Sequence, residues 1–416
     1  MDSMSGHIVH RCVVNTSRNS PVPSTHAWCH GDMRVAIITE SFLPEVNGVV
    51  NSVLRVLDHL IDHGHDVLLL APDAPGAPLD YRGVRVVGMT SMPLPGYQQV
   101  RLCATPQFVL EQTLAEFAPD VVHLASPINV GLRGALAADA LGIASVAVYQ
   151  TDVPGYAARY GVPTFETFLW QRVRITHTSA TLTLAPSSAS IEQLRGLGVH
   201  HLARWGRGVD SSLFHPGRRD ETWRTSIAPP DHRIVGFVGR LAPEKQVADL
   251  TAIADVPGVT TVIVGDGPER PALEAALPHA VFTGQLRGED LARAVASFDV
   301  FVTPGELETF GQTIQEAMAS GVPAIAPASG GPVDLIDPSR TGWLYSPGDL
   351  AGLRAHVADL IGDDTKRRAM GDAARNAMEP RTWPSLCRQL MGHYRSAIDL
   401  RRDRAVRSLT AAGRRV

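Results

Sequence analysis

Short apolar runs alternate with amphipathic stretches from residue 34 onward. Continuous apolar runs of four or five residues are typical of parallel strands that are covered on both faces. In the first half we expect strands at 35–38, 67–70, 84–87, 121–124, 146–149 and 182–184. The helices expected between them include 49–63, 130–141 and 164–179. This alternation predicts βαβ units and a doubly wound parallel sheet.

The same alternation restarts after a segment rich in Gly, Asp and Pro at 206–217, which reads as a hinge. We expect strands at 234–238, 262–264, 281–283, 300–302 and 324–326, and helices at 269–276, 290–297 and 313–320. The chain is helical again from 349 to about 398. Two α/β halves joined by a hinge place a cleft between the carboxyl ends of their sheets, where open α/β sheets bind ligands.

These patterns predict six segments along the chain. They are a leader at 1–32, a Rossmann-like domain at 33–205, the hinge at 206–217, a second Rossmann-like domain at 218–378, a helix at 379–398 and a basic tail at 399–416. The leader lacks periodicity and has no secretory signal, so we expect it to be disordered or to precede the true start. We expect the arginine-rich tail to be solvated and frayed; the alternative is an electrostatic anchor to anionic lipid.

Composition narrows the class of protein. The 416 residues suit two domains, and 44% of them are hydrophobic. A net charge of −4 gives no sign of a nucleic-acid partner. No apolar run reaches the ~18–20 residues of a spanning helix, so any membrane contact would be peripheral. The four cysteines show no metal-site or C-x-x-C spacing, which favours a reducing, cytoplasmic location.

The segment ETFGQTIQE at 308–316 carries the strongest chemical signal. Glu308 lies in a loop after an expected strand and can fold back over the cleft, whereas Glu316 lies within the expected helix, eight residues further on, which would be about two turns if both were helical. Gly311 allows close approach of the backbone to a ligand. The N–H groups near Gln312 and Thr313 lie at the positive end of the helix dipole and suit a phosphate or sugar oxygen.

A second motif, GRLAPEK at 239–245, also follows a buried strand. Gly239 permits a tight exit from the strand, and Arg240 and Lys245 can converge on a diphosphate. The chain has no Asp-x-Asp pair, the usual means of holding Mg²⁺ or Mn²⁺ against a diphosphate. We therefore expect no metal, because the two cations and the helix terminus can neutralise the leaving group.

Two segments of the first half complete the expected cleft. In the loop 40–48, Asn47 and Gly48 can adopt positive φ and present N–H groups to a phosphate, or form a plain turn. This loop is not a G-x-G-x-x-G fingerprint, which disfavours a dinucleotide oxidoreductase. The segment YQTD at 149–152 ends an expected strand, so Gln150 and Asp152 should face the cleft. Asp152 could orient an acceptor hydroxyl or a sugar hydroxyl, or it could cap the next segment.

Together these motifs resemble the GT-B glycosyltransferases of family 4. The shared patterns are E-x-F-G-x-x-x-x-E, G-R-L-x-x-E-K, G-D-G-P, A-S-G-G-P and the early E-x-F-x-P-x-x-x-G-V loop. The resemblance covers residues 33 to about 394. Within the family it looks most like actinobacterial GDP-mannose-dependent α-mannosyltransferases that act on glycolipids, on the segments YQTDVPGYAARYG at 149–161, IVGFVGRLAPEK at 234–245 and RGVD at 207–210.

The resemblance implies a role for each matching position. The second domain would hold the nucleotide sugar, with the diphosphate at Arg240 and Lys245, the sugar hydroxyls at Glu308 and the ribose at Glu316. Backbone of Phe310 and Gly311 would contact the sugar. Asn47 and Gly48 would close on the donor from the first domain, which would bind the acceptor. The helix at 379–398 would cross back onto that domain.

Many relatives carry His where this chain has Gln150, and Gln cannot titrate near neutral pH. The expected reaction is therefore front-face transfer of mannose with retention to a glycolipid or lipid-linked glycan, without an enzyme nucleophile. Peripheral contact with anionic lipid at the inner face of the plasma membrane would fit such an acceptor. The alternatives are a UDP-sugar donor and a catalytically silent protein that binds nucleotide sugars.

Overall fold

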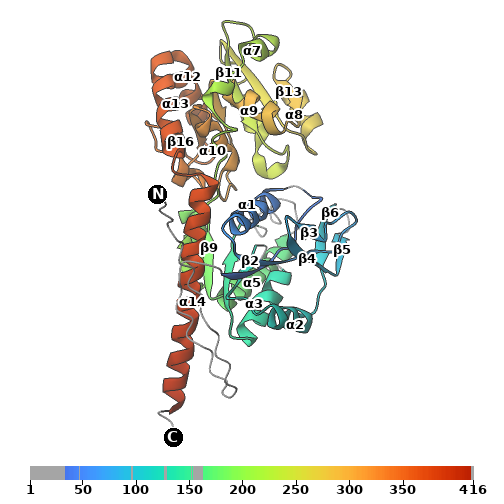
Figure 1. The fold of residues 1–416 in the computed structure, drawn as a ribbon. Coiled ribbons are helices and arrows are strands. Elements are labelled where there is room, and N and C mark those ends of the chain that lie inside the picture. The colour runs from blue at the N-terminus through green and yellow to red at the C-terminus, as the bar shows by residue number, and fades with distance from the viewer. Residues whose placement is uncertain are drawn as a thin grey trace, which may run out of the picture.

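A computed structural model describes residues 33–413 except 46, 95–96, 126–128, 151 and 153–162. The leader expected at 1–32 therefore lies outside the described residues. Two α/β domains, each a sheet covered by helices, are stacked end to end, and one long helix runs along the first domain (Figure 1). The expectation of two doubly wound parallel domains is confirmed.

The first sheet has eight strands in the order β10-β9-β8-β7-β1-β2-β4-β3. All its pairs are parallel except β3 with β4. Its strands are β1 (Arg34–Ile38), β2 (Asp66–Pro72), β3 (Asp80–Tyr81), β4 (Val84–Met89), β7 (Val121–Leu124), β8 (Ala144–Val148), β9 (Leu182–Ala185) and β10 (Leu202–Arg204). A separate hairpin pairs β5 (Ser91–Leu94) with β6 (Tyr97–Cys103).

Helices cover both faces of this sheet because successive residues of its strands point to opposite sides. Val35 and Ile37 pack in one buried cluster with α1 (Gly48–Asp62) and with the start of the long terminal helix. Ala36 and Ile38 pack in another with α2 (Gln107–Phe117) and α3 (Val130–Ala140). Beyond them lie α5 (Pro163–Ser179) and α6 (Ser188–Gly196).

The second sheet has six parallel strands in the order β13-β12-β11-β14-β15-β16. They are β11 (Arg233–Val238), β12 (Val259–Val264), β13 (Val281–Gly284), β14 (Val300–Val302), β15 (Ala324–Pro327) and β16 (Gly342–Tyr345). The helices around them are α7 (Glu221–Ile227), α8 (Arg270–Ala276), α9 (Gly288–Ala296), α10 (Gln312–Ala319), α11 (Pro332–Leu335), α12 (Leu350–Gly362) and α13 (Asp364–Met378).

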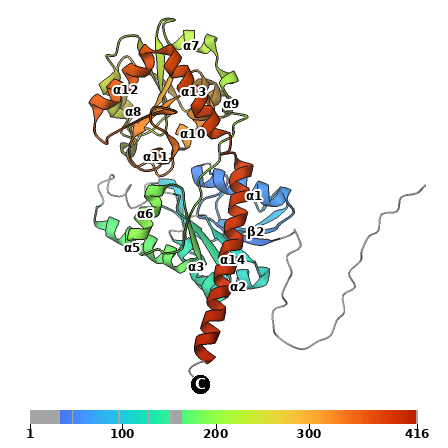
Figure 2. The ribbon, with the colours of Figure 1, turned by 90° about the vertical axis from the view of Figure 1, so that its left-hand side faces the viewer.

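The terminal helix α14 (Trp383–Gly413) returns from the second domain and packs along the first (Figure 2). The hydroxyl of Tyr394 lies 2.8 Å from Nδ1 of the buried His123, and Trp205 Nε1–H donates to the Leu386 carbonyl at 2.9 Å. The helix continues to Gly413, so the described part of the basic tail is helical rather than frayed. No helix of the described ranges is both long and apolar enough to cross a bilayer.

Two chain crossings between the domains lie beside each other. One is the segment near Val209, and the other is the approach to α14 at Arg381 and Thr382. An isolated parallel bridge joins Val209 to Thr382, and the N–H of Val209 donates to the Arg381 carbonyl at 2.9 Å. A Cβ on Gly208 would lie 2.5 Å from the backbone nitrogen of Trp383, so only glycine allows this approach.

Candidate active site

Lys245 and Glu308 meet at the carboxyl edge of the second sheet. Lys245 ends a short 3₁₀ turn after β11, and Glu308 lies in the loop between β14 and α10. The ammonium nitrogen is 2.7 Å from Oε2 of the carboxylate, and both side chains are about one-fifth exposed, at 22% and 19%. The pair is thus accessible from the cleft but partly shielded from water, which strengthens the interaction.

The other carboxylate oxygen of Glu308 folds back onto the start of α10. Oε1 accepts the N–H of Gly311 at 2.9 Å and that of Phe310 at 3.4 Å. Burial raises the pKa of the Glu308 carboxyl, but the charge and hydrogen bond of Lys245 and the two N–H groups outweigh it, so the pKa is lowered from its usual value. Glu308 is therefore ionised at neutral pH and positioned by both neighbours.

Gly311 makes this fold-back possible. It has a φ of 96°, in the left-handed region, and a Cβ there would lie 2.9 Å from Leu335 Cδ1 and 3.0 Å from Ile314 Cδ1. A side chain is therefore excluded both by backbone conformation and by packing. The N–H groups of Gln312 and Thr313 follow in the first turn of α10, where no preceding helical carbonyl is available to them.

Glu316 lies one turn further along α10 and is half-buried. Gln312 Nε2 donates to its Oε1 at 3.3 Å. Burial raises the pKa of the Glu316 carboxyl to about 7, and this single hydrogen bond lowers it only in part. The side-chain nitrogen of Gln312 also reaches the Gly208 carbonyl at 3.4 Å, so the side chain of this expected donor-binding residue faces the hinge.

Arg240 is exposed at the end of β11, and no hydrogen bond or ion pair joins its guanidinium to another described residue. It is thus available to a ligand without first giving up a partner, whereas Lys245 is already paired with Glu308. Gly239 precedes it, and its carbonyl oxygen would lie 1.9 Å from a Cβ on Gly265. The two glycine loops after β11 and β12 therefore touch backbone to backbone, beside the place expected for the diphosphate. Thr313 is half-buried in the first turn of α10.

The structure corrects one expectation in the first domain. Asn47 and Gly48 do not adopt positive φ; Asn47 has a φ of −145° and caps α1 instead. Its Oδ1 accepts the N–H groups of Val49 and Val50, each at 3.0 Å, because a polar residue before a helix satisfies its first donors. Gly48 begins α1 and lies against the guanidinium of Arg207, whose Nη1 would be 2.8 Å from a Cβ there.

Gln150 and Asp152 both lie on the side of the first domain that faces the second. The carboxamide of Gln150 bonds to the Ala125 carbonyl and to Arg207, each at 3.0 Å. Asp152 is buried and accepts a long hydrogen bond of 3.5 Å from Gln193. Thr151, between them, lies outside the described residues.

A cavity of about 210 Å³ between the domains brings Asp152 and Glu308 into one space. Ala189, Ser190 and Gln193 line it from the first domain, whereas Glu306, Thr309 and Ser329 line it from the second. Residues that the sequence placed in separate domains therefore face each other. Within the described residues, no group of three or more His, Cys, Asp or Glu side chains could hold a metal ion.

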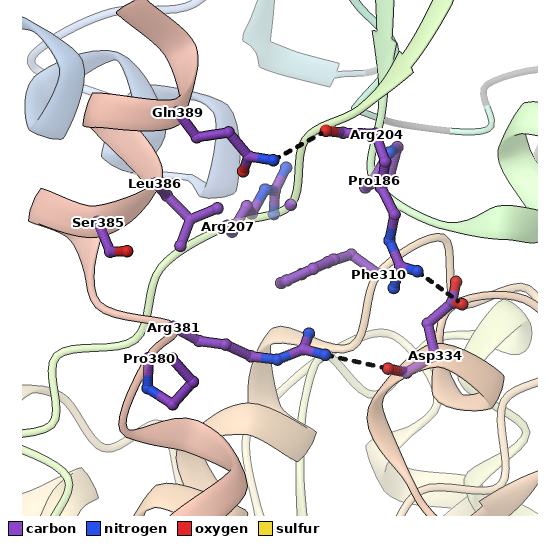
Figure 3. A pocket seen from close by; sticks show the side chains of 11 residues that line it. Pro186, Arg204, Arg207, Phe310, Asp334, Pro380, Arg381, Ser385, Leu386 and Gln389 are labelled. Atoms are coloured by element: carbon purple, nitrogen blue, oxygen red, sulfur yellow. Dashed lines mark hydrogen bonds and ion pairs between the residues drawn. The ribbon is translucent and has the colours of Figure 1, made fainter. Parts of the chain in front are cut away.

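A larger cavity of about 380 Å³ lies on the hinge side of Phe310. Its wall contains an ionic cluster at Asp334 of α11 (Figure 3). Arg204 of the first domain pairs with the Asp334 carboxylate at 3.1 Å, and Arg381 donates to its carbonyl at 3.2 Å. The same carboxylate accepts the N–H of Ser188 at 2.6 Å, at the start of α6. Asp334 therefore joins the two domains.

Sequence reasoning missed four residues that organise this region: Arg207, Thr309, Gln315 and Asp334. Arg207 belongs to the RGVD segment, and Thr309 and Gln315 belong to the 308–316 motif, so these three were in view without a role. Gln315 Nε2 donates to the Arg207 carbonyl at 3.0 Å. Nothing in local spacing indicates this contact, because its two residues are 108 positions apart.

Comparisons with known proteins agree with this architecture. The family described as "Glycosyltransferase Family 4" matches residues 46–213, and "Glycosyl transferases group 1" matches residues 219–377. A protein of Mycolicibacterium smegmatis described as "GDP-mannose-dependent alpha-mannosyltransferase" is 50% identical over 378 residues, which cover 90% of this chain and 100% of the relative. A protein of Corynebacterium glutamicum with the same description is 45% identical over 372 residues, covering 88% and 90%.

Among solved structures, Anabaena Alr3699/HepE in complex with UDP-glucose matches with a TM-score of 0.69 at 21% identity. The match covers 88% of this chain and 100% of that one. At that identity the likeness concerns the fold, in which two Rossmann-like domains face each other. With 50% identity over an aligned region that covers 90% of this chain and all of the relative, the chain belongs to the family 4 glycosyltransferases and has the GT-B fold.

Proposed function

We propose that the protein transfers mannose from GDP-mannose, with retention and without a metal, to a glycolipid or lipid-linked glycan. The donor and sugar follow from relatives that are 45–50% identical over about nine-tenths of the chain. The observation that carries the chemistry is the Lys245–Glu308 pair, whose carboxylate lies just before α10 and lines a cavity together with Asp152 of the opposite domain.

In this proposal Arg240, Lys245 and the first N–H groups of α10 neutralise the diphosphate as it leaves. Glu308 accepts hydrogen bonds from the donor sugar, and Glu316 accepts them from the ribose. The acceptor hydroxyl attacks C1 on the face from which the phosphate departs, so the new C–O bond forms as the old one breaks. The departing phosphate oxygen takes the hydroxyl proton, and no protein nucleophile is required.

Gln150 and Asp152 would position the reacting sugars from the first domain, and Asn47 and Gly48 would close on the donor. For the acceptor, we propose that the protein works at the cytoplasmic face of a membrane. The end of α14 supports this, since Arg402 and Arg407 are exposed there. Each basic residue near an anionic surface contributes roughly 1 kcal/mol to binding. Arg401 is instead held by Asp139.

The first test is thermal stabilisation of the full chain by GDP, UDP and ADP, each with and without Mg²⁺, followed by transfer of labelled mannose to a bacterial lipid extract. Selective stabilisation by GDP without Mg²⁺, together with labelled lipid, is the expected result. A preference for UDP would replace the donor and sink the mannosyl assignment. Stabilisation by GDP with no transfer to any extract would favour a nucleotide-sugar-binding protein.

A further inference from the structure

Residue 150 lies where the first domain, the hinge and the second domain meet. Its carboxamide nitrogen donates to the Ala125 carbonyl of the first domain at 3.0 Å, and its Oε1 accepts from Nη2 of Arg207 in the hinge at 3.0 Å. Its backbone carbonyl accepts the hydroxyl of Thr309, in the second domain, at 3.4 Å.

The two side-chain contacts select the same orientation of the carboxamide. A guanidinium can only donate hydrogen bonds, so the group that faces Arg207 must be the oxygen of Gln150. A carbonyl can only accept, so the group that faces Ala125 must be the nitrogen. Gln150 then retains one N–H and one oxygen lone pair beyond these two contacts, a pattern that suits a sugar hydroxyl.

Arg207 is itself fixed by the donor side of the cleft. Its carbonyl accepts the side-chain N–H of Gln315 from α10 at 3.0 Å, and the carbonyl of the next residue, Gly208, accepts that of Gln312. The Arg207 guanidinium lies against Gly48, so a side chain at that position would have to displace it. Arg207 thus physically links α10, which carries Glu316, to Gln150.

We infer that Arg207 is a positioning residue for mannosyl transfer, which fixes the orientation of the Gln150 carboxamide and connects it to α10. This inference rests on the proposed function. Arg207 acts through Gln150, so its loss should impair the chemical step more than donor binding. A neutral amide also suits this place, because a guanidinium opposes a second positive charge beside it.

A double-mutant cycle of Arg207→Ala and Gln150→Ala tests the inference. With the carboxamide misplaced in Arg207→Ala or removed in Gln150→Ala, each single variant should lose about 10- to 100-fold in kcat. The KM for GDP-mannose should change by less than about threefold, because the residues proposed to hold the diphosphate and the ribose lie elsewhere. The double variant should lose no more than the worse single variant, since residues that act through one contact are not additive. Arg207→Lys, which keeps a donor and the charge, should recover part of the loss.

Arg218→Ala is the matched control, because it removes a guanidinium paired with Glu289 on the surface of the second domain. It should turn over like the wild type. Multiplicative losses in the double variant would overturn the inference. So would a rise in KM with kcat unchanged, since that would make Arg207 a direct ligand of the donor.

Failure of the proposed function would be visible separately, as a wild-type protein that transfers no mannose. The four proteins of the cycle, which are the wild type, the two single variants and the double variant, would then be compared by melting temperature. A double variant that melts no lower than the less stable single variant would support the Arg207–Gln150 link. Additive decreases in melting temperature would overturn it.

Discussion

The ammonium nitrogen of Lys245 lies 2.7 Å from Oε2 of Glu308, whose other oxygen accepts the N–H of Gly311. One carboxylate thus connects the loop after β11 to the start of α10. A donor diphosphate that reaches Lys245 would share this cation with Glu308. The carboxylate would then turn toward the sugar while it remains tied to the helix.

Lys245→Ala should lower kcat/KM for GDP-mannose by about 10²- to 10³-fold, because it removes a preorganised charge from the leaving group and from Glu308. The measurement is steady-state mannosyl transfer at saturating acceptor. Lys366→Ala is a matched control, since that lysine also forms an ion pair, with Asp359, but away from the cleft. Equal activities for the two variants would contradict the role given to Lys245.

The affinity for GDP should fall as the pH drops from 8 to 6. Burial raises the pKa of Glu316 to about 7, so the carboxylate fraction falls from about nine-tenths at pH 8 to about one-tenth at pH 6. The carboxylate offers two charged oxygens to the ribose hydroxyls, whereas the protonated acid is neutral and carries an O–H on one of its oxygens. Calorimetric titration with GDP should show up to roughly tenfold weaker binding at pH 6. Glu316→Gln should bind weakly at both pH values; a pH dependence that survives in this variant would exclude Glu316 as its source.

The ligand-free protein should show the opposite effect on stability. Glu316 binds its proton more tightly when folded, because its pKa is raised from 4.5 to about 7. The free energy of unfolding therefore falls as the pH rises through this window. At pH 8, Glu316→Gln should be more stable than the wild type, by on the order of 1–3 kcal/mol after allowance for solvent. Urea unfolding at pH 5 and pH 8 measures this, and equal differences at the two pH values would count against it.

Gly311→Ala should destabilise the protein by about 2–3 kcal/mol, because it adds a steric clash to the cost of a positive φ. Gly348→Ala isolates the cost of the positive φ. Gly348 has a φ of 77°, and nothing lies within 4 Å of its Cβ position, so its replacement should cost only about 1 kcal/mol. Urea unfolding compares the two variants. Similar losses would mean that α10 moves to accommodate the methyl group.

Asp334→Asn should weaken the contact between the domains. The variant loses the ion pair with Arg204 and the charged acceptor for Ser188, so the radius of gyration in solution scattering should increase. The melting temperature should fall by about 1 °C, as expected for roughly 1 kcal/mol in a chain of this length. Asp337→Asn, whose partner Arg340 is exposed, serves as the control. An unchanged radius would show that other contacts hold the domains.

Much of the fold could be predicted because buried parallel strands consist of continuous runs of apolar residues. The expected strand at 300–302 agrees with β14, and that at 35–38 lies within β1. The edge strand β10 was missed because it is only three residues long and none of them is buried. The sequence Leu202, Ala203, Arg204 is too short and too polar to form a continuous apolar run. The hairpin at 91–103 was missed because no helix separates its two strands, so it does not show the strand–helix alternation that identified the other strands.

The candidate site, too, could be predicted only in part. Glu308 and Gly311 lie within one contiguous motif, so local sequence places them on a loop before a helix. Their partners do not follow from local sequence. Lys245 is 63 residues from Glu308, and Arg207 is 57 residues from Gln150. Such contacts depend on how the two sheets are arranged, which apolar periodicity does not encode.

The parallel bridge between Val209 and Thr382 limits how the domains can move. A single tether would permit swivelling about its own axis as well as bending. Two crossings fastened side by side resist the swivel, because twisting would shear the hydrogen bond from Val209 to Arg381. The motion that remains is a hinge rotation about the line that joins the two crossings. The cleft between Asp152 and Glu308 can then widen and narrow while their alignment is preserved.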